Sequence, residues 1–483
     1  MTAGPLRLAD LAGRSVVVWG LGREGAAAAR AAVRAGAAQV VAVTDAAPSP
    51  AELEAWSGGG LAAVAVRSLD GLDARALDVL GAADVVVLSP GVSRYRDEVE
   101  ALLARGVPVT GGTELFLAEQ GDRTVAVTGS KGKSTVTRLT AHLLQATVGH
   151  GGGEAVAAGN IGSALLDLLP GLTGPAPLVV AEVSSYQAAT VTSPPRVAVL
   201  TSLFPDHLPW HGGLERYYGD KLRLFAAGPQ VRLVNGADAT VAGLLGDPAL
   251  AGATTYGADG SRVRVAGEGP DAVVVVAGRA VLPLRSSRLP GVHNHVNVAA
   301  AVAVLDALDV DVAEAGAELA AALASFAPLP HRLEPVATVA DVTFVDDTLA
   351  TTAQAAVAAC EAYPDRPLTL LAGGLDRGID YEPLVAHLRE RAARTPLAVV
   401  AMGPAGGRIA AALPGVPVER TDDVADAVRI AAKLTPAGGV VLFSPAAPSP
   451  AEYGSYERRS AAFTAAVHDL ASAAPGRGAA GNS

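Results

Sequence analysis

A strand followed by a glycine- and lysine-rich turn is the feature that most constrains the fold of this chain. Residues 124–128 read TVAVT, an apolar run of the strand type, and the next six residues read GSKGKS. A helix-compatible run continues through Leu144. This order of strand, phosphate loop and helix N-terminus is the one that ATP chemistry requires, because the first N–H groups of the helix face the phosphates. The turn therefore predicts an α/β domain that binds ATP.

The residues of this loop have separate predicted tasks. Gly129 and Gly132 permit positive φ and a close approach of the backbone. Lys133 supplies a point charge to the phosphates, and the Ser134 hydroxyl supplies a ligand to Mg²⁺. The two glycines are closer by two residues than in the usual P-loop, and such a turn could also be an ordinary strand-to-helix connection. The predicted nucleotide-binding set is Gly129, Ser130, Lys131, Gly132, Lys133, Ser134 and Thr135.

Composition narrows the class of protein. A length of 483 residues predicts about three domains. The net charge of −11 and the pI near 5.3 argue against nucleic acid or an anionic membrane as the main partner. Cys360 is the single cysteine, so we expect no disulfide framework and a reducing, cytoplasmic location. No secretory signal is visible at the start, and no apolar run reaches the roughly 18 residues of a membrane span. We expect a monomer.

Four strand patterns in residues 1–119 predict a small parallel sheet with helices between the strands. The predicted strands are 15–19, 40–44, 84–88 and 107–110. Gly20, Gly22 and Gly25 follow the first strand, and Asp45 ends the second, which are the parts of a dinucleotide-binding fingerprint. The same geometry would hold a nicotinamide dinucleotide or a UDP-sugar, so a dehydrogenase stays open at this point.

Residues 120–328 place candidate metal ligands at the ends of two predicted strands. Glu182 lies at the end of the strand over 178–183, and His207 follows the strand over 196–202. With Ser134, these are oxygen and nitrogen ligands that could link Mg²⁺ to phosphates. A lone histidine is more often a satisfied interior side chain, but its place at a strand end beside the loop favours a metal role. Lys221, on the helix predicted over 214–225, would ordinarily be exposed.

Two asparagines follow a strand-rich stretch of about 230–290. Asn294 and Asn297 are three residues apart and share one face at the start of a predicted helix. They could hydrogen-bond a base or ribose, or could cap the helix. The prolines of residues 327–330 predict an extended linker after this helix.

Residues 329–474 alternate between strands and helices again. The predicted strands are 343–345, 368–371, 398–402 and 440–443. Asp346 and Asp347 end the first of these strands and the run GGLDRG ends the next, where a ligand crevice is expected. Arg332, at the domain junction, could place its charge on a γ-phosphate or could be an ordinary surface residue. Residues 475–483 are predicted to be a disordered tail.

Together these motifs resemble those of the Mur ligases of peptidoglycan precursor synthesis, specifically the ligases that add glutamate to UDP-N-acetylmuramoyl-L-alanine. The motifs are TGSKGKST (128–135), AGNIG (158–162), EVSSYQ (182–187), PDHL (205–208), DKLRLF (220–225), GVHNHVN (291–297), HRLE (331–334) and SPAAPS (444–449). The resemblance implies three α/β domains: an N-terminal Rossmann-like UDP-binding sheet, a central P-loop ATPase-like domain and a C-terminal Rossmann-like domain. It also implies that the glycine turn, with Ser89, Pro90 and Gly91, binds UDP rather than a nicotinamide dinucleotide.

The resemblance further implies that ATP phosphorylates the L-alanyl carboxylate and that the glutamate amine attacks the acyl phosphate. Lys133 and Arg332 would stabilise the phosphoryl charge, and Mg²⁺ would be held by Ser134, Glu182 and His207. Lys221 matches the lysine that is carbamylated in this family, which turns a cation into a metal-binding carboxylate. The other implied ligand contacts are Asn294 and Asn297 to adenine, Asp347 to ribose, Asn160 and His207 to the UDP-substrate, and Ser449 and Tyr456 around glutamate. Thr351 is a further predicted substrate-binding residue.

The sequence departs from the D-glutamate-adding pattern in the predicted amino-acid site. Residues 346–352 read DDTLATT, so Leu349 stands where a lysine is expected and Thr352 where an asparagine is expected. A lost charge-assisted contact is worth about 1.5–3 kcal/mol, so another group, with Arg377 a candidate, must orient the amino acid. The run PDHLPWH also differs from the usual DHLDRH. These departures favour the branch of the family that adds L-glutamate.

Two rival functions stay open on the sequence alone. A folylpolyglutamate synthase-like ligase would lack the UDP-binding N-terminal sheet that the glycine turn predicts here. A nucleotide-binding regulatory protein with a decayed acceptor site would explain Leu349 and Thr352.

Overall fold

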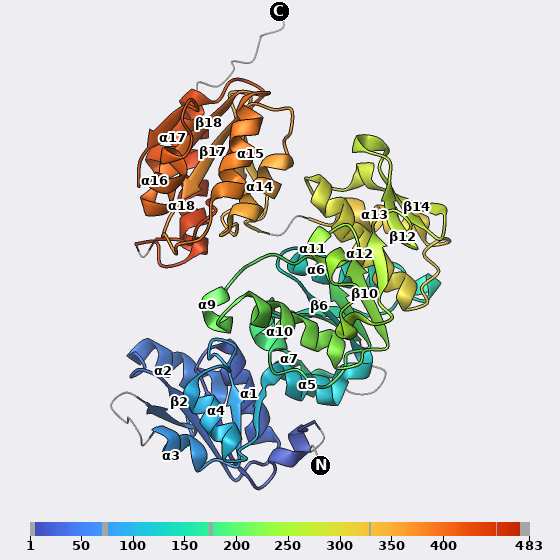
Figure 1. Ribbon diagram of the computed structural model, residues 1–483, viewed down its shortest axis with the longest axis vertical. Helices are drawn as coiled ribbons and strands as arrows, with labels where there is room; N and C mark the ends of the chain where they lie inside the picture. The colour runs from blue at the N-terminus through green and yellow to red at the C-terminus, as the bar shows by residue number, and fades with distance from the viewer. Residues whose placement is uncertain (1–4, 70–75, 173–176, 328–329, 451, 474–483) are drawn as a thin grey trace, which may run out of the picture. The chain divides into compact units, whose positions relative to one another are not determined.

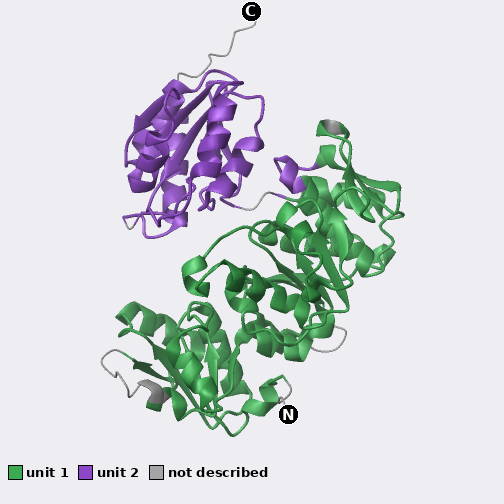
Figure 2. Ribbon diagram, in the orientation of Figure 1, with its two compact units in different colours: residues 1–286, 295–326 green, residues 287–294, 327–483 purple. Residues whose placement is uncertain are grey.

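The structure, a computed structural model, describes residues 5–69, 76–172, 177–327, 330–450 and 452–473, and these form three α/β sheets with their helices (Figure 1). The chain divides into two compact units: Met1–Ser286 with His295–Phe326, and Ser287–Asn294 with Ala327–Ser483 (Figure 2). The predicted α/β class with three sheets is confirmed. The domain bounds 119 and 328 stay predictions. The predicted tail 475–483 and part of the predicted linker lie outside the described residues.

The first sheet has the strand order β3-β2-β1-β4-β5 and is parallel throughout. Its strands are β1 Ser15–Trp19, β2 Gln39–Thr44, β3 Ala65–Ser68, β4 Val85–Leu88 and β5 Val109–Gly111. Its helices are α1 Arg23–Arg34, α2 Pro50–Trp56, α3 Ala76–Gly81, α4 Asp97–Ala104 and α5 Gly112–Gln120. The sequence analysis missed β3, because none of its four residues is buried and it has no apolar pattern. The strand order reverses beside β1, where open α/β sheets bind ligands.

The second sheet, also in the first unit, has the order β14-β13-β12-β11-β10-β9-β6-β8-β7. Its strands are β6 Thr124–Thr128, β7 Ala155–Gly159, β8 Leu178–Glu182, β9 Val197–Leu200, β10 Val231–Asn235, β11 Thr254–Gly257, β12 Val263–Ala266, β13 Val273–Val276 and β14 Arg279–Pro283. The strands from β7 to β12 are parallel, so β6, β8 and β9 end together at one edge. The apolar run of β6 is buried completely, as a strand covered on both faces requires.

The helices around this sheet include two that carry predicted site residues, α6 and α10. Their bounds are α6 Lys133–Ala146, α7 Leu165–Leu168, α8 Ser185–Ala188, α9 Leu208–His211, α10 Leu214–Ala226, α11 Ala239–Gly243, α12 Val292–Ala307 and α13 Gly316–Ser325. None of the helices in the described part of the chain has the length and apolar character to cross a membrane.

The third sheet, in the second unit, has the order β15-β16-β20-β17-β18-β19 and is parallel except for β15. Its strands are β15 Glu334–Val339, β16 Val342–Asp346, β17 Leu368–Gly373, β18 Leu397–Met402, β19 Val418–Arg420 and β20 Val440–Phe443. Its helices are α14 Ala353–Glu361, α15 Glu382–Ala392, α16 Gly403–Ala411, α17 Val424–Leu434 and α18 Tyr456–Ala473. The two edge strands β15 and β19 were missed, because both are short of buried apolar residues.

Candidate active site

The predicted phosphate loop lies between β6 and α6 and is anchored by the end of β9. The Ser130 N–H donates to the Ser202 carbonyl at 2.8 Å, and the Lys131 N–H donates to the Ser202 hydroxyl at 2.9 Å. Gly129 has φ +145°, and a Cβ there would lie 2.0 Å from Thr201 Oγ1, so only glycine fits. Because two loop N–H groups already bind Ser202, the N–H groups at the start of α6 are the ones to face an anion.

Two lysine side chains converge on one carbonyl of this loop. Lys133 Nζ and Lys221 Nζ donate to the Gly129 carbonyl at 3.0 Å and 2.8 Å. Lys221 comes from α10, is 2% exposed and lies over the ring of Tyr217. Burial, and then the charge of Lys133, lowers the pKa of Lys221 well below its ordinary value. The reading of Lys221 as an exposed lysine is therefore wrong, because α10 packs this face against the loop.

Glu182 brings a negative group to the same edge of the sheet. It ends β8, which neighbours β6, and it is 2% exposed. Its Oε1 accepts a hydrogen bond from Asn160 Nδ2 at 2.7 Å, whereas Oε2 is buried without a hydrogen-bond partner among the described residues. A buried carboxylate oxygen in this state is costly unless a cation is bound, and carboxylate oxygen is the ligand that Mg²⁺ prefers. The site therefore fits a divalent cation, with Ser134 buried at the start of α6 beside the loop.

His207 lies at this edge as well, after β9. It adopts φ +52° and its side chain is half exposed, so the alternative of a satisfied interior histidine is wrong. Its ring lies 5.2 Å from the ring of Tyr186. Partial burial lowers the pKa of His207, Asp206 opposes this, and the positive charges of the nearby lysines add to it. A neutral imidazole is the form that binds metals or accepts hydrogen bonds.

A pocket of about 300 Å³ in the first sheet contains several of the predicted UDP-binding residues. Gly20, Gly22 and Asp45 line it. Both oxygens of the Asp45 carboxylate have donors, since Trp19 Nε1 lies 3.2 Å from Oδ1 and Arg96 Nη1 lies 2.8 Å from Oδ2. Arg96 also stacks over the Trp19 ring at 4.7 Å. A ligand at Asp45 would therefore meet a fixed carboxylate beside a guanidinium.

Ser89 and Gly25 close the glycine turn of this sheet. Ser89 Oγ donates to the Gly20 carbonyl at 3.1 Å, and a Cβ on Gly25 would lie 2.0 Å from that carbonyl oxygen. Ser89 and Pro90 also line a small cavity together with Tyr186 and other residues that follow β8, while Gly91 is exposed. The glycine at position 25 is thus a steric requirement for packing α1 on the turn.

Asn297 and Asn294 have different surroundings on α12. Asn297 lies against the phosphate loop, because a Cβ on Gly132 would come within 2.7 Å of its Oδ1. Asn294 is buried and its Nδ2 donates to the Pro290 carbonyl at 2.6 Å. Asn294 is the third residue of α12 and its amide donates to a carbonyl, so it is not the N-cap and that alternative is wrong for this residue. Adenine binding by Asn294 stays a prediction.

The second unit gathers its predicted residues at the adjacent ends of β16, β20 and β17. Asp347 Oδ2 accepts a hydrogen bond from Ser444 Oγ at 2.7 Å, and Oδ1 accepts one from the Leu333 N–H at 3.2 Å. Arg332 Nε is buried and has no hydrogen-bond partner within the described chain. The remaining predicted residues occupy the loops after these strands or the start of α18: Thr351, Arg377, Ser449 and Tyr456. Of these, Arg377 is exposed.

The unexpected residue Thr352 has a structural role. Its Oγ1 accepts a hydrogen bond from the Ala355 N–H at 3.3 Å, and it is the N-cap of α14. Threonine can fill the N-cap position, as the expected asparagine also could, so the capping role is kept and does not itself explain the departure from the family pattern.

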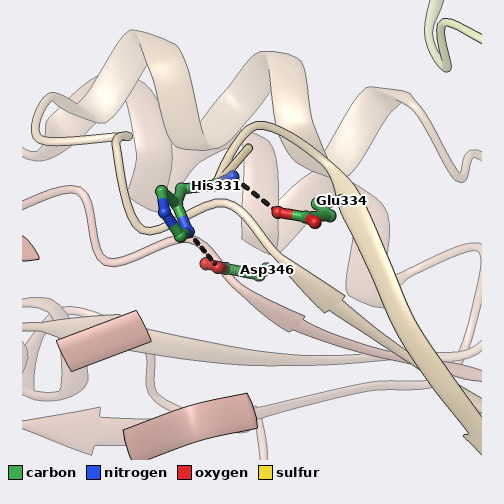
Figure 3. Close-up of side chains that lie close together, drawn as sticks. All are labelled: His331, Glu334 and Asp346. Atoms are coloured by element: carbon green, nitrogen blue, oxygen red, sulfur yellow. Dashed lines mark hydrogen bonds and ion pairs between the residues drawn. The ribbon is translucent and has the colours of Figure 1, made fainter. Parts of the chain in front are cut away.

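His331, Glu334 and Asp346 form a hydrogen-bonded cluster in the third sheet, where β15 begins and β16 ends (Figure 3). His331 Nδ1 lies 2.9 Å from Asp346 Oδ2, and the His331 N–H donates to Glu334 Oε2 at 2.8 Å. One ligand atom from each residue falls within 4.8 Å of the others, a spacing that could hold a metal ion. Asp346 also accepts hydrogen bonds from Ser460 Oγ and from the Thr348 N–H. Because protein donors already occupy its oxygens, we interpret the cluster as a hydrogen-bond network.

The sequence analysis missed two residues that hold the phosphate loop, Tyr217 and Ser202. The Tyr217 hydroxyl lies 2.8 Å from Ser130 Oγ. Tyr217 precedes Lys221 by four residues, so the two share one helix face, and this spacing could have identified it. Ser202 carried no comparable signal, because its three bonds to the loop join segments about 70 residues apart.

Replacement of Asp347 by asparagine is expected to change how stability depends on pH. Burial raises the pKa of Asp347 to about 7, from an ordinary value near 3.8. Between these two values the folded protein holds a proton that the unfolded chain has lost, so stability contributed by this group falls as pH rises. Relative to Asp347→Asn, the wild type should lose about 2–4 kcal/mol of unfolding free energy between pH 4 and pH 8. Urea unfolding at several pH values measures this, and parallel pH profiles for the two proteins would contradict it.

Each of the three sheets lies largely in a segment of the chain that matches a known protein family model. Family models match for the MurD-like N-terminal domain over residues 14–111, the Mur ligase middle domain over 127–305 and the Mur ligase glutamate ligase domain over 331–447.

The similar relatives span nearly the whole chain. The UDP-N-acetylmuramoyl-L-alanine--L-glutamate ligase of Salinispora tropica is 47% identical over 476 residues, which cover 96% of this chain and 100% of that relative. The proteins of the same name from a Micromonospora species and from Xanthomonas euvesicatoria are 48% and 38% identical, over 96% and 95% of this chain and over 99% and 96% of their own lengths.

Solved structures share the fold at low identity. The UDP-N-acetylmuramate-alanine ligase of Thermotoga maritima matches with a TM-score of 0.58 at 19% identity, over 94% of this chain and 99% of its own. The MurF ligase of Thermotoga maritima in complex with ADP matches with a TM-score of 0.56 at 17% identity, over 96% and 97%. The three domain matches and the full-length relatives together establish that the chain belongs to the Mur ligase family.

Proposed function

We propose that this protein joins L-glutamate to UDP-N-acetylmuramoyl-L-alanine, with cleavage of ATP to ADP and phosphate, in peptidoglycan precursor synthesis. The observation that carries the proposal is the convergence of Lys133, Lys221 and Glu182 at the end of β6 and β8. The relatives named for this reaction support it over nearly the full length. ATP and UDP-linked sugars are cytoplasmic metabolites, so we expect the enzyme to work in the cytoplasm. We also expect it to be a monomer.

The reaction needs two bond changes at one carboxylate. First, an oxygen of the L-alanyl carboxylate bonds to the γ-phosphorus, and the bond to ADP breaks. Then the glutamate amine bonds to the acyl carbon, phosphate leaves, and the amine loses a proton. Charge grows on the transferring group in the first step, so we assign Lys133 and Arg332 to its stabilisation. His207 and Asn160, on the loops after β9 and β7, would orient the reacting end of the UDP-substrate.

A magnesium ion would be held by Ser134, Glu182, His207 and a carbamylated Lys221. When bound, it would neutralise phosphate charge and bring ATP and the carboxylate into line. The unsatisfied Oε2 of Glu182 supports this assignment, because a buried anion of this kind calls for a cation.

Carbamylation of Lys221 is expected because its environment favours the neutral amine. Only an uncharged Nζ can attack CO₂, and burial beside Lys133 lowers the pKa of Lys221. Protein equilibrated with ¹³C-bicarbonate should therefore show one carbamate signal by ¹³C NMR. The signal should vanish in Lys221→Ala and persist in Lys433→Ala, a control at an exposed lysine of α17. A signal unchanged in Lys221→Ala would refute the assignment.

Preference for L-glutamate is expected from the site of the incoming amino acid. Leu349 lies in the loop after β16, where the D-glutamate-adding pattern has a lysine, and the relatives are named for L-glutamate. Product formation and phosphate release with each enantiomer, run side by side, should differ at least roughly 100-fold in kcat/KM in favour of the L form. A faster reaction with D-glutamate would contradict the proposed preference for L-glutamate. Background phosphate release with both would overturn the ligase proposal and favour a non-catalytic nucleotide-binding protein.

A further inference from the structure

Arg332 lies between two residues whose backbone is left-handed. His331 has φ +60° and Leu333 has φ +47°, and both carry a Cβ, so this conformation costs free energy at each position. The Nε atom of Arg332 between them is buried and has no hydrogen-bond partner in the described part of the chain. A strained turn that carries an incompletely bonded guanidinium needs contacts that hold it in place.

Carboxylates bind the main chain of this turn on both sides of Arg332. The His331 N–H donates to Glu334 Oε2 at 2.8 Å, and the Leu333 N–H donates to Asp347 Oδ1 at 3.2 Å. The Leu333 bond holds the peptide directly after Arg332, and the His331 bond holds the peptide one residue before the arginine; the peptide between His331 and Arg332 is held by its carbonyl, which accepts the Leu349 N–H at 3.3 Å. These main-chain bonds do not restrain the ring of His331, whose own hydrogen bonds can also hold the turn in place.

The His331 ring is bound by β16 and α18. Its Nδ1 lies 2.9 Å from Asp346 Oδ2, at the end of β16, and 2.7 Å from Ser460 Oγ, on α18 (Figure 3 shows the Asp346 bond). Ser460 Oγ also donates to Asp346 Oδ2, so its single hydrogen is committed and it accepts the Nδ1–H of His331. The edge of the Tyr456 ring covers the imidazole, with centroids 5.8 Å apart.

We propose that Ser460 is a positioning residue for Arg332. Through His331 and Asp346, its hydroxyl ties α18 to the 331–333 turn and holds in one orientation the guanidinium that the proposed function assigns to the transferring phosphoryl group. Ser460 is 2% exposed and is distant in sequence from the turn that it holds. The inference rests on the proposed function, since it needs Arg332 to act on that group.

A double-mutant cycle tests whether Ser460 acts through Arg332. Ser460→Ala should lower kcat at least tenfold and leave the KM for the UDP-substrate within twofold of wild type. Ser460→Thr keeps the hydroxyl and should restore most of the activity. In an Arg332→Ala background, Ser460→Ala should cause no further loss, because the group that it positions is absent. Ser455→Ala is the matched control, a hydroxyl just before α18 whose Oγ accepts the Arg458 N–H.

Hydrogen exchange gives a readout that does not depend on activity. Exchange of the His331 and Leu333 amides should speed up at least tenfold in Ser460→Ala and stay unchanged in Ser455→Ala. Multiplicative losses in the cycle, or unchanged exchange in Ser460→Ala, would overturn the inference. If the wild type releases no phosphate with either glutamate enantiomer, the proposed function fails, and the exchange experiment alone still decides whether Ser460 holds the turn.

Discussion

Replacement of Lys133 by alanine should lower the kcat of glutamate-dependent phosphate release by roughly a thousandfold or more. Binding of the UDP-substrate should stay nearly intact. Lys133 is the first residue of α6, and its Nζ donates to the Gly129 and Ser130 carbonyls of the phosphate loop. It is thus a cation fixed where phosphate charge would develop, and alanine removes it without disturbing the buried strand β6. The predicted UDP pocket belongs to a different sheet, so its affinity should not change.

The two readouts separate the sites only if both are measured on the same preparations. Isothermal titration with UDP-N-acetylmuramoyl-L-alanine gives the affinity, and a coupled phosphate assay gives the rate. Lys433→Ala is the matched control, because it removes an exposed lysine on α17, a helix of the C-terminal α/β domain. Equal losses of affinity and rate in Lys133→Ala would show that the two sites are not separable as proposed.

Apolar periodicity predicted the buried strands of all three sheets closely. Residues 15–19 and 440–443 form strands with the predicted bounds, since both are continuous apolar runs covered on both faces. The strands that were missed, β3, β7, β15 and β19, lie at sheet edges, where fewer positions are buried and the apolar pattern is weak. A single sequence carries little signal for such strands.

Contacts between distant segments were the part of the site that sequence could not predict. The burial of Lys221 depends on α10 packing under Gly129, and the bond from Ser460 to His331 joins residues far apart in the chain. Neither leaves a periodic pattern or a short motif. The loop residues themselves were predictable, because strand, glycine turn and helix start are consecutive in the chain.

Replacement of Glu182 by glutamine should remove activity and raise the stability of the metal-free protein. Glutamine keeps an oxygen for the Asn160 amide but removes a buried charge whose Oε2 has no hydrogen-bond partner in the described chain. Loss of an unsatisfied buried charge should stabilise the fold by about 1–2 kcal/mol. Activity should fall roughly a hundredfold or more, because the proposed cation loses a charged ligand. Opposite changes in stability and activity are typical of a residue that a site holds at a cost to the fold.

Thermal unfolding with and without Mg²⁺ and ADP measures both consequences. The wild type should gain stability when the ion and nucleotide are added, whereas Glu182→Gln should start from a higher midpoint and gain less, since ligand stabilisation scales with affinity. Glu54→Gln, at an exposed glutamate of α2, should behave as the wild type does. If Glu182→Gln is destabilised without ligands and still gains the full increment from Mg²⁺, then Glu182 is a structural residue and the cation binds elsewhere.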